Sequence, residues 1–238
     1  MKTRLIGICG HKHSGKDTIA NIISFIISNG INRSFNDWMD GQFHLANTSI
    51  RKLRVTHFAD PVKDIISALF NIPRDYLDDE LYKDKVLYCC DSGLFMTKID
   101  CERRNYNVIS NHEMIEKGLS SVLKPSRNCF YIRQLMQYIG TTIGRYKLYD
   151  SVWIDSTRKR VNKIIGNYGY CIIPDVRFQN EASFIHNNEG KIIYVDRGEQ
   201  TDPHESELID FEYDIHIKNN KTLMNLYYQV LSVIQNEL

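Results

Sequence analysis

The stretch Gly10-His-Lys-His-Ser-Gly15-Lys16-Asp17-Thr18 decides the fold that we expect for this chain. It follows an apolar run, Leu5-Ile-Gly-Ile-Cys9, and precedes isoleucines at 19, 22, 23 and 26, the spacing of one helix face. A strand, a glycine-bounded loop ending in Gly-Lys, and a helix form the context in which backbone N–H groups surround a phosphate. The stretch therefore predicts a nucleoside triphosphate site, with ATP as the expected ligand; a plain glycine turn is the alternative.

The loop residues suggest how such a ligand would be held. We expect the side chain of Lys16 and the backbone amides of Ser14, Gly15, Lys16, Asp17 and Thr18 to bind the β- and γ-phosphates. Asp17 stands where Ser or Thr normally offers a hydroxyl to Mg²⁺. A carboxylate can also bind Mg²⁺, directly or through water, so Asp17 is the candidate metal ligand and Mg²⁺ the expected cofactor. If Asp17 spoiled metal placement, the protein would bind nucleotide without turnover.

Composition narrows the class of protein. The chain has 238 residues, of which 42% are hydrophobic and 25% charged, as expected for one larger α/β domain. The formal net charge of +1 gives no general case for nucleic acid or membrane binding. No run approaches the roughly 20 apolar residues of a membrane helix. We therefore expect no nucleic acid and no membrane among its partners.

The cysteines predict a reducing compartment. Six are scattered along the chain without a Cys-x-x-Cys pair, and no secretory signal is present. We expect all six to be reduced and the protein to be cytoplasmic, in the host cytoplasm if it is viral. The set Cys89, Cys90, Cys101 and His112 matches no usual zinc spacing, so no zinc site is expected.

Strand and helix patterns alternate along most of the chain. Alternation predicts a strand over 53–58, and Asp60-Pro61 predicts a helix with Asp60 as its N-cap and an inward face of Val62, Ile65, Ile66 and Leu69. Residues 29–50, rich in Asn, Ser, Asp and Gly, are predicted to form a loop or a short insertion. We expect further helices over 130–139, 150–165, 180–187 and 223–234, an interruption over 140–145, and strands over 170–174, 191–195 and 213–217.

This alternation predicts an α/β fold with a five-stranded, mostly parallel sheet covered by helices on both faces. We expect a single domain over 1–238, with 71–128 as a variable insertion. Ligands of such sheets lie at the carboxyl ends of the strands. The glycine loop, Asp60 and Asp175 are all predicted to lie at that edge.

Five ordered blocks of sequence carry a resemblance to a known family. They are Gly10-x-Lys12-x-Ser14-Gly-Lys-Asp-Thr18, Phe58-Ala-Asp60-Pro-Val-Lys63, Arg133-Gln-Leu-Met-Gln137-x-x-Gly140-Thr141, Trp153, and Ile173-Pro-Asp175-Val-Arg177 with Glu181 and the following Ile193-Tyr-Val195-x-Arg197. In these blocks the chain resembles the deoxynucleoside monophosphate kinases of bacteriophages, a branch of the P-loop nucleoside monophosphate kinases. Residues 71–128 match poorly, and nothing is carried over there.

The resemblance implies the P-loop NTPase fold and transfer of the γ-phosphoryl group of ATP to a deoxynucleoside monophosphate (dNMP), giving dNDP and ADP. It implies that Lys12 contacts the monophosphate and that homodimers are common among such kinases. The attacking phosphate oxygen is already anionic, so positioning and charge neutralisation suffice and no general base is needed. Lys16, Arg133 and Arg145 are the expected catalytic cations.

The other candidates have two interpretations each. Arg133 suits the acceptor phosphate or forms a surface salt bridge, Arg145 binds either phosphate or is structural, and Lys63 binds dNMP or is a solvated helix lysine. Trp153 bounds the base or packs in the core, and Gln137 binds a base edge or is plain helix polarity. Arg177 reaches a phosphate or pairs with Glu181, and Asp175 meets Mg²⁺ or orients Arg177. The candidate dNMP-binding set is Lys12, Asp60, Lys63, Arg133, Gln137, Gly140, Thr141, Trp153, Asp175, Arg177 and Glu181.

Two other functions stay open from the residues alone. One is a P-loop kinase for another small phosphorylated acceptor. The other is an ATP-dependent switch or nucleic-acid-associated ATPase, which would hydrolyse ATP without a monophosphate acceptor. The sequence does not specify the base or the sugar of the acceptor.

Overall fold

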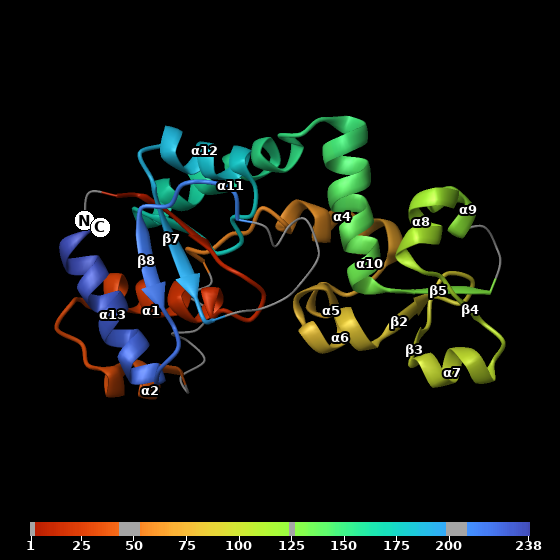
Figure 1. Ribbon diagram of the computed structural model, residues 1–238, viewed down its shortest axis with the longest axis horizontal. Helices are drawn as coiled ribbons and strands as arrows, with labels where there is room; N and C mark the ends of the chain where they lie inside the picture. Colours follow the sequence, from red (N-terminus) through yellow and green to blue (C-terminus); the bar gives the residue numbers. More distant parts are fainter. Residues whose placement is uncertain (1–2, 43–52, 124–126, 199–208) are drawn as a thin grey trace. The chain divides into compact units, whose positions relative to one another are not determined.

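The computed structural model describes residues 3–42, 53–123, 127–198 and 209–238, which fold into two compact units (Figure 1). Unit 1 contains Met1–Phe58 and Ile154–Leu238, and unit 2 contains Ala59–Trp153. Unit 2 is thus inserted in the sequence of unit 1, whose two terminal segments meet where Thr3 N–H donates to the carbonyl of Leu238.

The centre of unit 1 is a parallel sheet of four strands in the order β6-β1-β7-β8. All three strand pairs are parallel, with Ile6 opposite both Ile172 of β6 and Lys191 of β7. The strands are β1 (Leu5–Cys9), β6 (Cys171–Ile173), β7 (Lys191–Asp196) and β8 (Ile215–Lys218).

Helices cover both faces of this sheet, as Figure 1 shows for α1 and α13 on one side and α11 and α12 on the other. Alternate residues of each strand point to opposite faces, so Ile6 and Ile8 pack with α1 and α13, and Leu5 and Cys9 pack with α11 and α12. The helices of unit 1 are α1 (Lys16–Asn29), α2 (Phe35–Gln42), α11 (Val152–Tyr168, beginning in unit 2), α12 (Gln179–Asn187) and α13 (Leu223–Asn236).

Most elements predicted for unit 1 are present, with two corrections. The sheet has four strands among the described residues, and the strand expected over 53–58 is reduced to one parallel bridge from Val55 to Ile172. The expected loop over 29–50 contains α2, whose Trp38 is buried beside Tyr227 of α13. Residues 43–50 of that predicted loop lie outside the described residues.

Unit 2 combines short helices with a small mixed sheet in the order β3-β2-β5-β4. Its strands are β2 (Leu87–Cys89), β3 (Phe95–Met96), β4 (Asn107–Val108) and β5 (Asn128–Tyr131). Its helices are α4 (Asp60–Phe70), α5 (Arg74–Asp78), α6 (Glu80–Lys85), α7 (Lys98–Arg103), α8 (Asn111–Lys117), α9 (Leu119–Val122), α10 (Ile132–Gln137) and the wider π-type helix η1 (Tyr138–Leu148).

Unit 2 corrects several sequence predictions. Phe130 lies in β5, so the helix predicted over 130–139 begins at Ile132, and the interruption expected over 140–145 is the continuous helix η1. Ala59, not Asp60, is the N-cap of α4. Val62 and Ile66 face the core as predicted, but Ile65 and Leu69 are exposed, because only one side of this short helix meets the rest of the unit.

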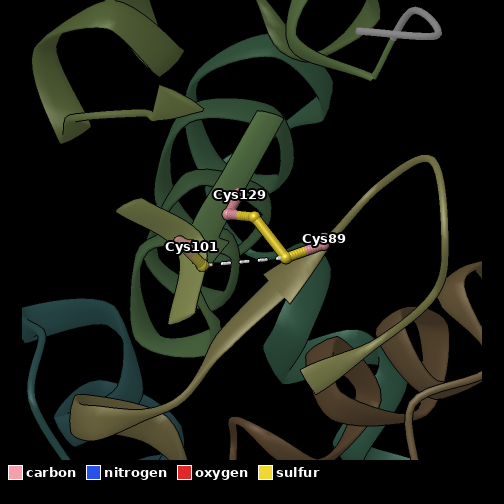
Figure 2. A group of neighbouring side chains, drawn as sticks. All are labelled: Cys89, Cys101 and Cys129. Carbon is pink, nitrogen blue, oxygen red and sulfur yellow. Dashed lines mark hydrogen bonds between the residues drawn. A yellow bond between two sulfur atoms is a disulfide. The ribbon is translucent and has the colours of Figure 1, made fainter. Parts of the chain in front are cut away.

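A disulfide bond joins Cys89 and Cys129, so the prediction that all cysteines are reduced is wrong for this pair (Figure 2). The two residues lie directly opposite each other on antiparallel strands β2 and β5, with Cα atoms 4.2 Å apart. Their separation of 40 residues gave no sign of this pairing, which depends on strand register. Cys9, Cys90, Cys101 and Cys171 are free.

No helix in the described part of the chain is both long enough and apolar enough to cross a membrane.

Two residues of α4 test the packing of unit 2, because the sequence assigned both to one face and the structure separates them. Ile66 is 0% exposed and Leu69 is 72% exposed. We expect Ile66→Ala to lower the free energy of unfolding by about 2–5 kcal/mol, because it leaves a cavity. Leu69→Ala, the matched control, should change it by less than about 0.5 kcal/mol. Urea titration followed by circular dichroism measures both, and equal losses would contradict the assigned face.

Candidate functional site

The loop between β1 and α1 approaches the sheet edge closely, and its two glycines allow this. Gly10 and Gly15 have φ angles of +147° and +103°. A Cβ atom on Gly10 would lie 2.5 Å from the carbonyl oxygen of Val195 in β7, and one on Gly15 would lie 2.5 Å from Nδ2 of Asn219. A side chain at Gly10 would collide with the backbone of β7, and one at Gly15 would displace the Asn219 side chain and strain a left-handed backbone.

Lys16 opens α1 and folds its side chain back over the loop. Its Nζ atom donates to the carbonyls of Gly10 and His11, each at 2.6 Å. Ser14 is 1% exposed, and its Oγ atom has no hydrogen-bond partner among the described residues. A buried hydroxyl without a partner costs free energy. The loop thus places an ammonium group and an unused hydroxyl at the N-terminus of α1, where an anion is favoured.

Two side chains from the far end of the chain hold this loop, and sequence reasoning missed both roles. Asn219, just after β8, donates from Nδ2 to the carbonyl of Ser14 at 2.8 Å. Arg197, just after β7, donates from Nη1 to the carbonyl of His13 at 3.0 Å. Both follow strands whose carboxyl ends lie at the same edge as the loop, and that position is the signal that could have identified them.

The loop before unit 2 joins the same edge. His57 Nε2 lies 3.6 Å from the carboxylate of Asp17, whose side chain is 88% exposed. The next residue, Phe58, donates its backbone N–H to Asp175 Oδ1 at 2.9 Å. Asp17 and Asp175 therefore contact successive residues of one short segment. Lys12 and Thr18 lie half-buried on the loop and in the first turn of α1.

Arg177 and Glu181 meet at the start of α12, where Glu181 acts as a helix cap. Its Oε2 atom accepts the backbone N–H groups of Arg177 at 2.8 Å and Phe178 at 3.2 Å. Glu181 is 2% exposed, so its carboxylate caps the helix and is not offered to solvent. The four-residue spacing thus brings Glu181 to the backbone of Arg177.

Cys9, the last residue of β1, has a buried thiol and is not a candidate nucleophile. Its side chain is fully covered at the end of β1, and burial raises its pKa to about 12 despite the nearby charge of Lys16. The thiol therefore stays protonated at neutral pH.

In unit 2, Asp60 and Lys63 of α4 belong to an ion-pair network around Arg74, which sequence reasoning did not single out. Arg74 Nη2 lies 2.6 Å from Asp60, and Arg74 also pairs with Asp64 and Asp78. Lys63 Nζ lies 2.7 Å from Asp78 and is 8% exposed. Burial would raise the pKa of Asp78, but Lys63 and Arg74 lower it overall, so the carboxylate stays ionised.

Arg133, on α10, also lies among carboxylates. Its guanidinium pairs with Asp84 and with Glu80, the latter at 2.5 Å. The same Glu80 contacts Lys83 at 2.5 Å, and burial lowers the pKa of this lysine. Arg133 is therefore part of a second ion-pair network built on α6.

The remaining candidates of unit 2 lie on η1 or next to it in the chain, and Trp153 packs against that helix. The indole N–H of Trp153 donates to the carbonyl of Gly140 at 2.7 Å, and a Cβ atom on Gly144 would lie 2.3 Å from its ring. Trp153 is 4% exposed and packs in the core of unit 2. Arg145, also buried, points Nη1 toward the Asp150 carboxylate at 3.5 Å. Thr141 on η1 and Gln137 at the end of α10 are half-buried.

The candidate residues thus form two groups, one in each unit. Unit 1 carries the loop residues with Asp175, Arg177 and Glu181. Unit 2 carries Asp60, Lys63, Arg133, Gln137, Gly140, Thr141, Arg145 and Trp153.

Comparison with known proteins identifies the family. A family model described as deoxynucleotide monophosphate kinase matches residues 4–230, almost the whole chain. The chain belongs to the deoxynucleotide monophosphate kinase family. The match includes the loop of unit 1 and all of unit 2, so both groups of candidate residues lie inside it.

Two viral proteins are similar to this family member. A protein of Acanthamoeba polyphaga mimivirus, provisionally named a deoxynucleotide monophosphate kinase, is 32% identical over 124 residues, covering 44% of this chain and 61% of that protein. Deoxynucleoside-5′-monophosphate kinase of Escherichia phage T5 is 23% identical over 201 residues, covering 76% of this chain and 71% of that protein. The chain thus matches about three fifths of the mimivirus protein's length.

The contact between Asn219 and Ser14 gives a direct test of the loop. We expect Asn219→Ala to speed amide hydrogen exchange at residues 14–18 and to weaken ATP binding about fivefold, since one hydrogen bond contributes about 1 kcal/mol. Exchange mass spectrometry and titration calorimetry measure the two effects. Asn220→Ala, an exposed neighbour in the same turn, is the control. Equal exchange in the two variants would show that Asn219 does not hold the loop.

Proposed function

We propose that this protein transfers the γ-phosphoryl group of ATP to a deoxynucleoside 5′-monophosphate, giving ADP and the deoxynucleoside diphosphate. The observation that carries the proposal is the glycine loop at the carboxyl edge of the parallel sheet, lying within a family match over residues 4–230. We further propose that unit 1 has the P-loop NTPase fold and binds ATP. Unit 2 then supplies the groups for the acceptor.

The loop suits the triphosphate because it places the ammonium group of Lys16 and the unpartnered hydroxyl of Ser14 at the start of α1. Lys16 now satisfies the carbonyls of Gly10 and His11, and on ATP binding its ammonium moves to the β- and γ-phosphates. Amides from Ser14 to Thr18 hold the same oxygens, and Ser14 Oγ gains the partner that it lacks. Lys12, on the same loop, adds charge toward the acceptor phosphate.

Unit 2 suits a phosphate because its cations are held in place by carboxylates. Arg133 presents a planar guanidinium to Glu80 and Asp84, and a phosphate has the same kind of oxygen pair as a carboxylate. We propose that the dNMP phosphate replaces these carboxylates on Arg133. Lys63 and Arg145 support it electrostatically, and Gln137, Gly140 and Thr141 contact the nucleoside.

We expect Mg²⁺ to be bound by carboxylate oxygens, which are hard ligands. Asp17 fits this role because its carboxylate is solvent-accessible in the first turn of α1, beside the proposed phosphate site. Asp175 is the second carboxylate of that edge. When bound, the ion would offset the negative charge of the ATP phosphates.

The chain's residues then have simple tasks. The acceptor oxygen is anionic at neutral pH, so the protein needs only to align two phosphates and offset their charge. Asp60 orients Arg74 and through it the cationic network, and Arg177 is placed at the sheet edge by Glu181. Trp153 supports η1 from the core rather than by stacking on the base.

A panel of acceptors tests the function as a whole. The protein is incubated with ATP, Mg²⁺ and each of dTMP, dGMP, dCMP, dAMP and UMP, and ADP release is measured. We expect ADP release to depend on at least one deoxynucleotide. Equal rates with ribose and deoxyribose acceptors would contradict the deoxy preference, and ADP release without any acceptor would indicate an ATPase instead.

Lys16→Ala tests the donor site. We expect turnover to fall about 100-fold or more, because a charge aimed at the transferring phosphoryl group is lost. Lys163→Ala, which removes an exposed lysine of α11, should leave turnover unchanged. Steady-state ADP release measures both variants, and a Lys16→Ala enzyme with normal turnover would refute the assignment of the loop.

Arg133→Ala tests the acceptor site. We expect KM for the dNMP to rise about tenfold or more while KM for ATP stays within about twofold, since charge-assisted hydrogen bonds contribute about 1.5–3 kcal/mol. Arg103→Ala, an exposed arginine of unit 2, is the control. Thermal unfolding of each variant shows whether it is folded. An unchanged KM for dNMP together with lost stability would make Arg133 purely structural.

A further inference from the structure

The sulfur atoms of Cys89, Cys101 and Cys129 converge inside unit 2, far along the chain from the loop of unit 1 (Figure 2). They come from β2, α7 and β5, and their three sulfurs lie within 4.8 Å of one another. Each residue is 0% exposed. The disulfide uses Cys89 and Cys129 and leaves Cys101 as a free thiol beside it.

The third sulfur is not placed for thiol–disulfide exchange. Cys101 Sγ lies 3.9 Å from Cys89 Sγ. Attack on a disulfide proceeds along the S–S axis, so Cys101 would have to lie about 6 Å from Cys129 Sγ, the sum of this distance and a disulfide bond of about 2 Å. The observed separation is at most 4.8 Å. Cys101 therefore lies beside the disulfide, and the three sulfurs surround a common point.

A common point between three sulfurs is the arrangement of a metal site. Zinc–thiolate bonds of about 2.3 Å place three sulfurs around one ion about 4 Å apart. The Cys101–Cys89 distance of 3.9 Å already has this value, and Cys129 Sγ lies within 4.8 Å of both other sulfurs. The surroundings are apolar and include Met96, whose thioether is another soft donor.

We propose that the reduced forms of Cys89, Cys101 and Cys129 bind one thiophilic d¹⁰ metal ion, such as zinc, that joins β2, α7 and β5. The disulfide of the present structure is the oxidised, metal-free form of the same cluster. Interconversion needs a thiol–disulfide couple such as glutathione. In the metal-bound form both cysteines are thiolates, so Cys89 and Cys129 each give up one electron in forming their bond. Oxidised glutathione takes up these two electrons and two protons from water to become two thiols. The metal ion leaves as its ligands are lost.

The sequence spacing gave no sign of this site because Cys129 is distant from the other two. The set considered from sequence, Cys89, Cys90, Cys101 and His112, shares only two members with it. Cys90 lies in the turn just after β2 and packs against a different hydrophobic cluster of unit 2 from Cys89, Cys101 and Cys129. Cys90 is therefore the natural control for the proposal.

The test compares the full chain in two redox states, using zinc as the probe. One sample is reduced with a phosphine and desalted under nitrogen, and the other is oxidised with oxidised glutathione. Zinc binding is measured by competition with a chromophoric chelator, with Mg²⁺ as the control ion. We expect one tightly bound zinc ion per reduced chain and none per oxidised chain. No binding after reduction, or equal binding in both states, would overturn the proposal.

Two variants locate the ion. Cys101→Ser should lower zinc affinity at least about tenfold while the Cys89–Cys129 disulfide still forms on oxidation, which thiol counting measures. Cys90→Ser should bind zinc as the unchanged chain does. Circular dichroism checks folding, and Cys101→Ala serves if Cys101→Ser is unstable. Normal affinity in folded Cys101→Ser or Cys101→Ala would overturn the proposal. The binding assay is independent of kinase activity, so its outcome does not depend on the proposed function.

Discussion

The close approach of the glycine loop to the ends of β7 and β8 is the constraint on which the candidate donor site depends. Gly10 lies against the backbone of Val195, and Gly15 lies against the amide of Asn219. The carbonyls of His13 and Ser14 face Arg197 and Asn219, whose side chains donate hydrogen bonds to them. The two carbonyls are thereby held by side chains, beside a helix N-terminus whose positive dipole end favours an anion. The loop is thus arranged by residues about 200 positions later in the chain.

In unit 2 the candidate cationic side chains are paired with carboxylates. Lys63, Arg74, Lys83 and Arg133 all have carboxylate partners, and two of these cations are less than a tenth exposed. Removing a partner from a buried ion pair is costly, because the remaining charge is left without compensation. A dianionic phosphate can replace a carboxylate without that penalty. The network therefore keeps the proposed acceptor cations in position while no nucleotide is bound.

Helices of unit 2 are short, and its sheet has strands of two to four residues. Each of these short elements buries little apolar surface by itself. Cross-links between them therefore contribute a large part of the stability of unit 2. The register of β2 and β5, which sets Cys89 against Cys129, provides one such link. The π-type helix η1 is held differently, by the indole of Trp153 against Gly140 and Gly144.

The sequence by itself determined the glycine loop between a strand and a helix, the parallel α/β character of unit 1 and the inward isoleucines of α1, because periodicity and glycine positions are local signals. It also contained the blocks that place the chain in its family. Only the tertiary structure decided that Asn219 and Arg197 hold the loop and that Arg133 lies between Glu80 and Asp84. It alone brought Cys101 to Cys89 and Cys129. Each of these contacts joins different elements, and strand register and helix packing, rather than spacing along the chain, set which side chains meet.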